Sequence, residues 1–312
     1  MDTEAVKSLV AEQYGLGTPS RVELLTRGQN DTYIVETTDE RYAFRVYGSG
    51  KPWIRGDDDL RFELDLLTHL HAQRAPVSYP LPTRDGSTLG RVSTSTGERR
   101  CALFTWAYGQ PMDSEHWAPE AASRLGHALA TIHVAADSFT TTYSRYRLDV
   151  STLLDRSTER MRDQLERADP TIVAFIEQQV AEIRRRLQDF DPGPGGWGII
   201  HTDPQSLNIH VAGDAVTFFD FDLCGLGWRA HDIAYALRHT GAENDPAAQR
   251  RRAAFLDGYR SVRQLAASEL EMLPTSGRAA WVREGTEAGH GLPPSKLAVY
   301  LRDPYLPWQI DP

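Results

Sequence analysis

The spacing of apolar residues divides the chain into a first third of alternating segments and a remainder of helical ones. Successive side chains of a strand point to opposite faces of its sheet, so alternation between short turns predicts antiparallel strands. The pattern occurs at residues 22–26, 32–37, 41–47, 89–94 and 99–106. Turns that contain Gly, Asn, Asp, Thr or Ser separate neighbouring segments, which predicts a sheet built from hairpins.

One helix is predicted between the third and fourth strands. Leu60, Leu64, Leu67 and Leu70 keep the spacing of a helix face that packs against a sheet. The three Asp residues at 57–59 begin this helix, where carboxylates suit the positive end of the helix dipole. We therefore expect these carboxylates to stabilise the helix and not to bind a metal ion.

The remainder of the chain is predicted to be mainly helical. Helical spacing occurs at residues 114–136, 151–168, 170–190 and 253–273. The first of these helices carries His133 on its apolar face, which favours a buried histidine with hydrogen-bond partners over a metal ligand. After residue 274 the character changes to many Gly, Pro and charged residues with brief apolar groups. That composition predicts an atypical, poorly packed tail over 275–312.

The segment 200–222 contains the residues that indicate a catalytic function. His201, Asp203 and Asn208 stand in an H-x-D-x-x-x-x-N spacing, and Asp220-Phe221-Asp222 follows after one short apolar strand. An Asp that accepts a hydroxyl proton and an Asn five positions later that can hold Mg²⁺ are the pair that a kinase catalytic loop needs, with a further carboxylate facing them across the metal. An Asp or Asn alone in a loop is more often a turn cap, but the joint spacing favours phosphoryl transfer.

Strands are predicted on both sides of this loop. Residues 198–200 precede it and residues 215–219 precede Asp220; both runs are apolar and β-prone, so we expect buried strands. Gly213 and Asp214 supply the turn of a hairpin. This arrangement would bring the loop and Asp220 together.

The pattern resembles the aminoglycoside phosphotransferase and choline-kinase-like family, the small-molecule branch of the protein-kinase-like fold. The resemblance implies that Asp203 is the catalytic base, that Asn208 and Asp220 bind Mg²⁺, and that His201 braces the loop. It also implies a structural Asp232, which would cap a buried helix and anchor the catalytic loop.

The resemblance extends to a nucleotide-binding hairpin and its supporting ion pair. Gly28 and Asn30, in the first turn, would let the backbone approach phosphates, although an ordinary turn explains them equally well. The family places a phosphate-pairing Lys on the third strand, where this chain has Arg45. Arg45 is expected to pair with Glu63 of the Leu-rich helix. A guanidinium group binds carboxylate and phosphate through two N–H donors at once, whereas a Lys ammonium group acts as a single point charge.

Residues 104–109 are interpreted as the hinge between two lobes. In kinase-like folds the hinge backbone pairs with adenine, so Phe104 and Trp106 are expected at the nucleotide site; ordinary core packing of these aromatics is the alternative. The resulting fold class is α+β, with an antiparallel N-terminal sheet lobe and a larger, mainly helical lobe. We predict a nucleotide lobe over 1–106, a catalytic and acceptor lobe over 107–274, and the tail over 275–312.

Composition limits where the protein is expected in the cell and which classes of partner it is expected to bind. The formal net charge of −9 argues against a nucleic-acid surface, which is normally basic. Cys101 and Cys224, the two cysteines, lie in apolar contexts that favour buried free thiols. No apolar run approaches the roughly 20 residues of a membrane span, and the first residues lack the pattern of a signal peptide. We therefore expect a cytoplasmic protein without membrane or nucleic-acid partners; its oligomeric state is not set by these features.

The predicted activity is transfer of the γ-phosphoryl group of ATP, or of GTP, to a hydroxyl with the assistance of Mg²⁺. The acceptor would be a small molecule: an aminoglycoside, homoserine, choline or a related amino alcohol, or a sugar. A protein Ser or Thr hydroxyl is the first alternative. A non-catalytic nucleotide-binding module is the second, favoured by Arg45 and the tail and opposed by the complete set of Asp203, Asn208 and Asp220.

Overall fold

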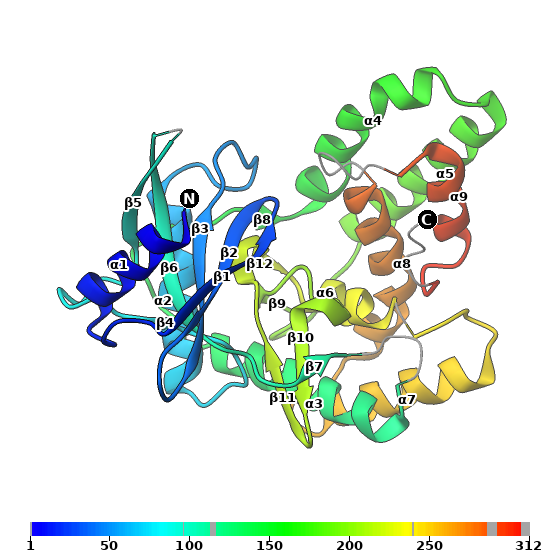
Figure 1. The fold of residues 1–312 in the computed structure, drawn as a ribbon. Coiled ribbons are helices and arrows are strands. Elements are labelled where there is room, and N and C mark those ends of the chain that lie inside the picture. The colour runs from blue at the N-terminus through cyan, green and yellow to red at the C-terminus, as the bar shows by residue number, and fades with distance from the viewer. Residues whose placement is uncertain (1, 96, 113–116, 239, 286–291, 307–312) are drawn as a thin grey trace. The chain divides into compact units, whose positions relative to one another are not determined.

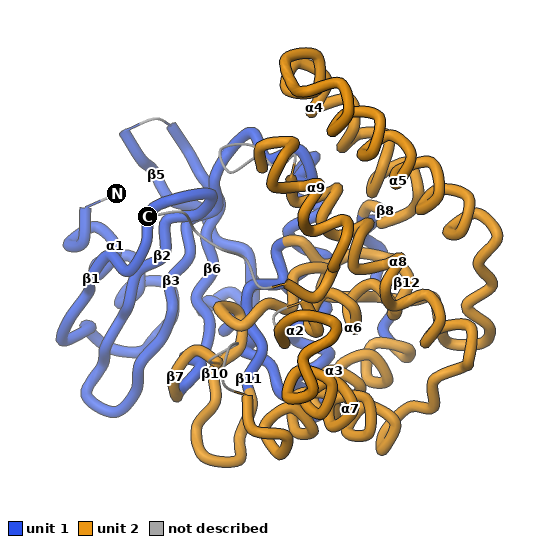
Figure 2. The backbone as a smooth tube through the Cα atoms, turned by 90° about the vertical axis from the view of Figure 1, so that its right-hand side faces the viewer, with its two compact units in different colours: residues 1–108, 139–145, 217–222 blue, residues 109–138, 146–216, 223–312 orange. Residues whose placement is uncertain are grey.

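The chain forms two compact units in a computed structural model, which describes residues 2–95, 97–112, 117–238, 240–285 and 292–306 (Figure 1). Unit 1 consists of Met1–Tyr108, Phe139–Arg145 and Thr217–Asp222. Unit 2 consists of Gly109–Ser138, Tyr146–Val216 and Leu223–Pro312 (Figure 2). Two later segments of the sequence thus belong to the N-terminal unit. The functional division at residues 106 and 274 stays a prediction, because compactness does not show what a unit binds.

Unit 1 is built on an antiparallel sheet. The strands follow the order β1-β2-β3-β6-β4, and β5 also pairs with β6. In β2 every second side chain is buried, as expected for a strand with one face against a core. The strand bounds are β1 Arg21–Arg27, β2 Asn30–Glu36, β3 Arg41–Tyr47, β4 Pro80–Leu81, β5 Gly90–Thr94 and β6 Gly97–Thr105. The predicted hairpins are therefore confirmed.

Two helices complete unit 1: α1 (Thr3–Tyr14) and α2 (Asp57–Ala72). Val6 and Val10 of α1 pack with Tyr33, Val35 and Phe44 of the sheet in one apolar core. The four predicted Leu residues of α2 are buried, and its first turn holds the three Asp residues. Arg100 pairs with Asp57 at 2.8 Å and Arg55 with Asp59 at 2.7 Å, so these carboxylates are held by side chains of the protein.

Unit 2 is mainly helical. Its long helices are α3 (Pro119–Ala136), α5 (Pro170–Gln188), α7 (Pro246–Arg260) and α8 (Ala267–Glu284), and its shorter ones α4 (Arg156–Glu166), α6 (Arg229–Leu237) and α9 (Pro294–Arg302). Single turns η1 (Ser151–Asp155) and η2 (Ser206–Asn208) lie between them, and η3 (Phe221–Leu223) begins in unit 1. No helix of the described residues is both long and apolar enough to span a bilayer.

Short strands of unit 2, one of which continues into unit 1, flank the catalytic segment. β12 (Gly225–Trp228) pairs with β9 (Trp197–Ile200) and with β8 (Arg147–Leu148). β10 (Ile209–Ala212) pairs with β7 (Gln110–Pro111), and β11 (Ala215–Phe218) follows it along the chain. The two strands that precede the predicted site residues are only partly buried, which differs from the fully buried strands expected; their last residues, Ile200 and Phe218, are buried.

The described part of the tail is packed, in contrast to the expectation for 275–312. α8 continues through Pro274 to Glu284, and α9 buries Leu297, Tyr300 and Leu301. Trp281 is fully buried and stacks on Tyr300, with ring centroids 3.8 Å apart. Small residues allow this close packing, so few large apolar positions mark it in the sequence. Residues 286–291 and 307–312 lie outside the described part.

Two glycines set the distance between α3 and α7. A Cβ on Gly126 of α3 would lie 1.9 Å from the carbonyl oxygen of Phe255, and a Cβ on Gly258 of α7 would lie 1.9 Å from that of Ser123. Either atom would overlap backbone, which cannot move as a flexible side chain can. The two helices therefore cross at a separation that only glycine permits.

We expect Gly126→Ala to destabilise the protein, although Ala normally favours a helix. Overpacking costs about 2 kcal/mol, which for a unit of this size lowers Tm by roughly 4–8 °C. Thermal unfolding followed by circular dichroism measures the change. Gly56→Ala is the matched control, because nothing lies within 4 Å of a Cβ at that position; equal Tm values for the two variants would contradict the packing explanation.

Candidate functional site

The catalytic segment of unit 2 begins where β9 ends. The backbone N–H groups of His201 and Thr202 donate to the two carboxylate oxygens of Asp232, at 2.7 and 2.8 Å. Thr202 has a φ of +72°, in the left-handed region that β-branched residues rarely adopt. The paired hydrogen bonds hold this strained turn, so the direction of the chain into Asp203 is set by one carboxylate.

Asp232 is itself fully buried on α6 and is held by His133. The Nε2 atom of His133 lies 3.1 Å from Asp232, and its Nδ1 atom lies 2.7 Å from the hydroxyl of Tyr259. Burial raises the pKa of Asp232, but the bond to His133 and nearby histidines outweigh it and leave that pKa below its usual value. The prediction of a satisfied core histidine is confirmed. Asp232 anchors the loop as expected, although it lies in the first turn of α6 and the N-cap is Trp228.

The predicted base and the predicted metal ligand touch each other. Nδ2 of Asn208 donates to Oδ2 of Asp203 at 2.9 Å and to the Asp203 carbonyl at 3.0 Å. Nε2 of Gln205 donates to the same carboxylate at 3.1 Å. The Asp203 N–H points to Nδ1 of His201 at 3.4 Å, which fits the bracing role expected for that histidine. The sequence does not reveal the role of Gln205, because an amide inside a loop carries no pattern of its own.

A second group of predicted residues lies in unit 1. Arg45 on β3 places Nη1 3.2 Å from Glu63 of α2 and Nη2 3.1 Å from Asp220. Glu63 is fully buried and the Arg45 side chain is 10% exposed, whereas the Asp220 side chain is 40% exposed. Arg45 and Glu63 are therefore a buried pair, and Asp220 is the member of the group that solvent and ligands can reach.

At Arg45 and at Glu63, burial shifts the pKa in one direction and the opposite charges nearby shift it in the other. Burial raises the pKa of Glu63 to about 7, while Arg45 opposes the rise. Burial alone would lower the pKa of Arg45, but Asp220 and Glu63 outweigh it and raise that pKa. The guanidinium also lies 5.1 Å from the ring of Phe104. Arg45 thus remains a fixed cation between two carboxylates.

Gly28 and Asn30, which are expected at a phosphate loop, lie where β1 passes into β2. Asn30 is the first residue of β2, and its side chain contacts Asp222 at 2.9 Å and Lys51 at 2.5 Å. Gly28 is exposed, and a Cβ at this position would meet nothing within 4 Å. The turn alone does not require a glycine, so a phosphate contact at Gly28 stays a prediction.

The two hinge aromatics occupy different positions. Phe104 lies inside β6, opposite Ala43 of β3 and Pro80 of β4, and is 5% exposed. Trp106 follows the last residue of β6, is half-buried and carries Arg41 5.3 Å from its ring. The Phe104 side chain therefore packs in the core, and the Trp106 side chain is partly exposed; contacts of the hinge backbone with a nucleotide stay a prediction.

The predicted site residues thus form two groups, one in each unit. Unit 1 brings together Arg45, Glu63 and Asp220; unit 2 brings together His201, Asp203 and Asn208. Among the described residues no three His, Cys, Asp or Glu side chains form a metal cluster. Both cysteines are buried free thiols, as predicted.

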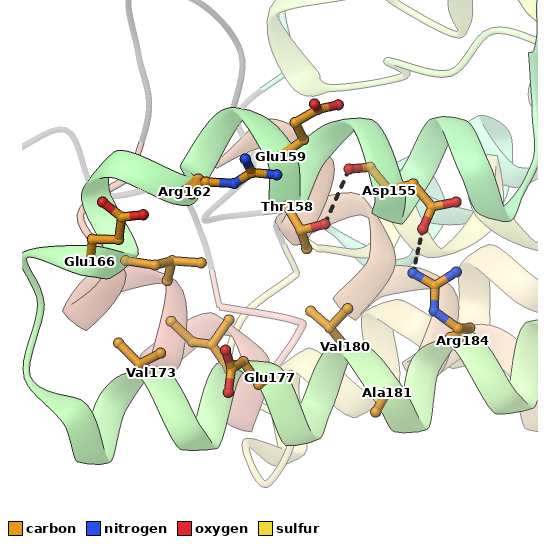
Figure 3. Close-up of a pocket in the computed structure, with 12 residues that line it drawn as sticks. Asp155, Thr158, Glu159, Arg162, Glu166, Val173, Glu177, Val180, Ala181 and Arg184 are labelled. Carbon is orange, nitrogen blue, oxygen red and sulfur yellow. Dashed lines mark hydrogen bonds and ion pairs between the residues drawn. The ribbon is translucent and has the colours of Figure 1, made fainter.

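A groove in unit 2 lies apart from these residues, between α4 and α5 (Figure 3). Its volume is about 680 Å³, its lining includes Val173 and Val180, and carboxylates such as Glu159, Glu166 and Glu177 border it. None of the residues predicted for catalysis lines it.

The family model described as "Phosphotransferase enzyme family" matches residues 22–265 of the chain. The chain belongs to the phosphotransferase enzyme family. The match extends from β1 to beyond α7, so it includes both groups of predicted site residues. The protein is therefore a kinase of the family that phosphorylates hydroxyls of small molecules, and the resemblance seen in the sequence is confirmed.

Two relatives cover most of the chain. An uncharacterized protein of Deinococcus radiodurans is 34% identical over 282 residues, which are 89% of this chain and 80% of that protein. A homoserine kinase of Brucella anthropi is 28% identical over 277 residues, 87% of this chain and 79% of the kinase.

Solved structures share the fold. A microcompartment-associated aminopropanol kinase has a TM-score of 0.76 at 23% identity and covers 96% of this chain and 94% of its own. An amicoumacin kinase in complex with AMP-PNP, Ca²⁺ and amicoumacin has a TM-score of 0.77 at 18% identity, with 99% and 96% covered. The predicted α+β kinase-like fold, an antiparallel sheet followed by a helical part, is confirmed.

His231, the residue before the anchor Asp232, is buried, and no hydrogen bond from the described residues offsets the loss of contact with water. It is 1% exposed, and neither ring nitrogen has a hydrogen-bond partner among the described residues. Burial, aided by Arg283 and opposed by Asp232, lowers the pKa of His231 to about 3. The folded protein therefore keeps this imidazole neutral at a pH where the unfolded chain protonates it.

We expect His231 to lower the free energy of unfolding as the pH decreases from 7.5 to 5. The unfolded His231 binds a proton near its ordinary pKa of 6.5 and the folded one only near 3, so this residue accounts for about 2 kcal/mol of the loss at pH 5. His231→Leu should reduce the acid sensitivity by that amount in urea titrations at the two pH values. His127→Leu, at an exposed position of α3, should not; equal acid sensitivity of both variants would refute the assignment.

Proposed function

We propose that the protein transfers the γ-phosphoryl group of ATP to the hydroxyl of a small amino alcohol, with Mg²⁺ as cofactor. The observation that carries this proposal is the direct contact of Asp203 with Asn208 in the H-x-D-x-x-x-x-N loop. A half-buried carboxylate fixed by two amide donors and a backbone anchor is suited to accept a proton from an acceptor hydroxyl.

Each unit offers an oxygen atom of the kind that a Mg²⁺–nucleotide complex needs. Asn208 uses its amide nitrogen for Asp203, which leaves its oxygen as the atom that would contact a cation. Asp220 offers a carboxylate that is 40% exposed. One or two oxygen ligands from the protein suit Mg²⁺, which takes the rest from phosphates and water. When bound, the ion would neutralise charge on the phosphates.

Arg45 would serve the phosphates in place of the usual Lys. Its fork already contacts Glu63 and Asp220, so it is held in one orientation. Arg keeps its charge at every relevant pH and donates through several N–H groups. An ATP analogue is bound in the amicoumacin kinase of the same fold, which supports ATP as the donor.

The surroundings of Asp203 favour an acceptor that carries charge. The Tyr235 hydroxyl donates to Oε2 of Glu284 at 3.2 Å, and burial, together with the nearby charge of Asp203, raises the pKa of Tyr235. Arg238 pairs with Glu284 and is stacked between the rings of Tyr235 and Trp281, 4.1 and 3.7 Å from their centroids. The carboxylate of Glu284 is thus one tyrosine hydroxyl away from the proposed base.

An amino alcohol matches this arrangement. With its hydroxyl at Asp203, its ammonium group would lie toward Glu284, whose side chain is 21% exposed. The names of relatives support the same chemistry, since homoserine and aminopropanol are both amino alcohols. Homoserine is the acceptor to test first, because the curated homoserine kinases align with most of this chain.

Asp203→Asn should abolish turnover with homoserine, aminopropanol and choline as acceptors while Mg·ATP still binds. Loss of a general base lowers kcat by about 10²–10⁴-fold. Phosphorylated product is measured by mass spectrometry, and nucleotide binding by thermal shift. Asp214→Asn, whose side chain is 93% exposed in the same unit, is the control. Full turnover by the Asp203→Asn variant would remove the base assignment, and no product from the wild type with any acceptor would reject the proposed function.

Glu284→Gln should raise KM for homoserine by about tenfold, equivalent to about 1.4 kcal/mol. The amide keeps the shape of the side chain. It weakens the pair with Arg238, which affects both acceptors alike, and it loses the attraction for an ammonium group. Steady-state kinetics with homoserine and with 4-hydroxybutanoate, which lacks the amine, isolates that loss. Glu182→Gln, on the exposed face of α5, is the control. An equal rise in KM for both acceptors would show that Glu284 does not recognise the amine.

A further inference from the structure

Lys51 is a buried lysine in unit 1 that no sequence pattern marks. It is one of three lysines in the chain and lies between β3 and α2. Its side chain is 5% exposed. A buried ammonium group is costly unless it is paired and hydrogen-bonded, so its partners define its role.

The partners of Lys51 are a carboxylate, an amide and two aromatic rings. Nζ donates to Oδ2 of Asp222 and to Oδ1 of Asn30, the latter at 2.5 Å. The rings of Tyr47 and Trp53 lie 5.8 and 5.9 Å from it. The ammonium group is therefore held in one place by charge, hydrogen bonds and aromatic faces.

Asp222 is bound through both carboxylate oxygens and its carbonyl. Oδ2 accepts from Lys51 and from Nδ2 of Asn30 at 2.9 Å, and Oδ1 accepts from Nε1 of Trp53 at 3.1 Å. Arg145 donates to the carbonyl of Asp222. With its side chain 7% exposed and these contacts made within unit 1, Asp222 is an anchor of the protein and not an open ligand atom.

The anchor lies two residues after Asp220. Between them Phe221 is 1% exposed, and Asp220 has a φ of +64°, in the left-handed region. A backbone in this region is retained only where its surroundings fix it. The contacts on Asp222 supply that fixation on one side of Asp220, and Arg45 holds the carboxylate itself.

We propose that Lys51 is a positioning residue for Asp220 and acts through Asp222. Lys51, Asn30 and Trp53 together form a clamp on Asp222. This clamp fixes the backbone conformation from which the Asp220 carboxylate would bind a magnesium ion. Arg45 and Lys51 thus divide two tasks: Arg45 orients the exposed carboxylate, and Lys51 fixes the chain that carries it. The inference rests on the proposed function, since it gives Asp220 a role only where Mg·ATP binds.

The test compares Lys51→Met, Asp222→Asn and the double variant by two readouts. Hydrogen exchange of the peptide that covers residues 217–222, measured without nucleotide, reports the clamp itself. The Mg²⁺ concentration for half-maximal ATP binding, measured by calorimetry, reports the placement of Asp220. Lys7→Met, on α1 of the same unit, is the matched control.

We expect Lys51→Met to speed exchange of this peptide at least tenfold and to raise the half-maximal Mg²⁺ concentration at least fivefold. Metal-free ATP binding should stay unchanged, and the double variant should be no worse than the worse single one. Lys51→Arg keeps the charge and should stay within threefold of the wild type. If Lys51→Met does not fold, Asp222→Asn carries the comparison; it keeps one of the two acceptor oxygens and removes the charge that pairs with Lys51.

Unchanged exchange in folded Lys51→Met or Asp222→Asn would overturn the clamp. Additive losses together with weaker metal-free ATP binding would overturn it too, because Lys51 would then contact phosphate directly. Absence of Mg·ATP binding by the wild type would defeat the proposed function and, with it, the role given to Asp220; the exchange readout distinguishes that failure from a failure of the clamp.

Discussion

Buried carboxylates that hold the backbone are the constraint on which the rest of the structure depends. In unit 2, Asp232 accepts the N–H groups of His201 and Thr202 and fixes the turn before Asp203. In unit 1, Asp222 is held through both oxygens two residues after Asp220. A carboxylate away from water is stable only with complete partners. Each of these two carboxylates therefore has one arrangement, and each fixes the position of a more accessible carboxylate: Asp203 follows the turn that Asp232 holds, and Asp220 lies two residues before Asp222.

The replacement of the usual lysine by Arg45 is explained by the geometry of its partners. Arg45 contacts Glu63 through Nη1 and Asp220 through Nη2, so the two branches of one planar group serve two carboxylates. A lysine offers a single point charge on a flexible stem and would have to share it. The change is thus compatible with a working site, and Arg45 gives no physical reason to favour a non-catalytic module.

Much of the fold and the central site residues can be predicted from local sequence. Alternation at 41–47 predicts a strand and β3 lies there, because alternation along a strand is a local property. Asp203 and Asn208 lie five residues apart, so a local spacing marks both residues, although their hydrogen bond is seen only in the structure. By contrast, Lys51 and Asp222 are 171 residues apart, and no local pattern marks their pairing. Lys51 follows Gly48 and Gly50 and has the sequence context of a solvated loop.

The prediction of a poorly packed tail is wrong for the described residues, and for a related reason. α8 contains Pro274 and buries Thr275, Ser276 and Gly277, residues that normally end helices or stay exposed. Their burial depends on close packing with residues further along the chain, as where a Cβ on Gly277 would lie 3.1 Å from the Cβ of Pro304. Periodicity detects large apolar side chains, whereas small ones that permit close approach leave no comparable signal.

We infer above all that the chain is a working kinase whose nucleotide site requires magnesium. The thermal shift of the full chain with ATP, with and without Mg²⁺, tests this inference, because a ligand that binds only the folded protein stabilises it by RT ln(1 + [L]/Kd). We predict a rise in Tm with Mg²⁺ and millimolar ATP that is clearly larger than with ATP alone. The absence of any shift with the nucleotide and the metal would contradict the inference and favour a non-catalytic role.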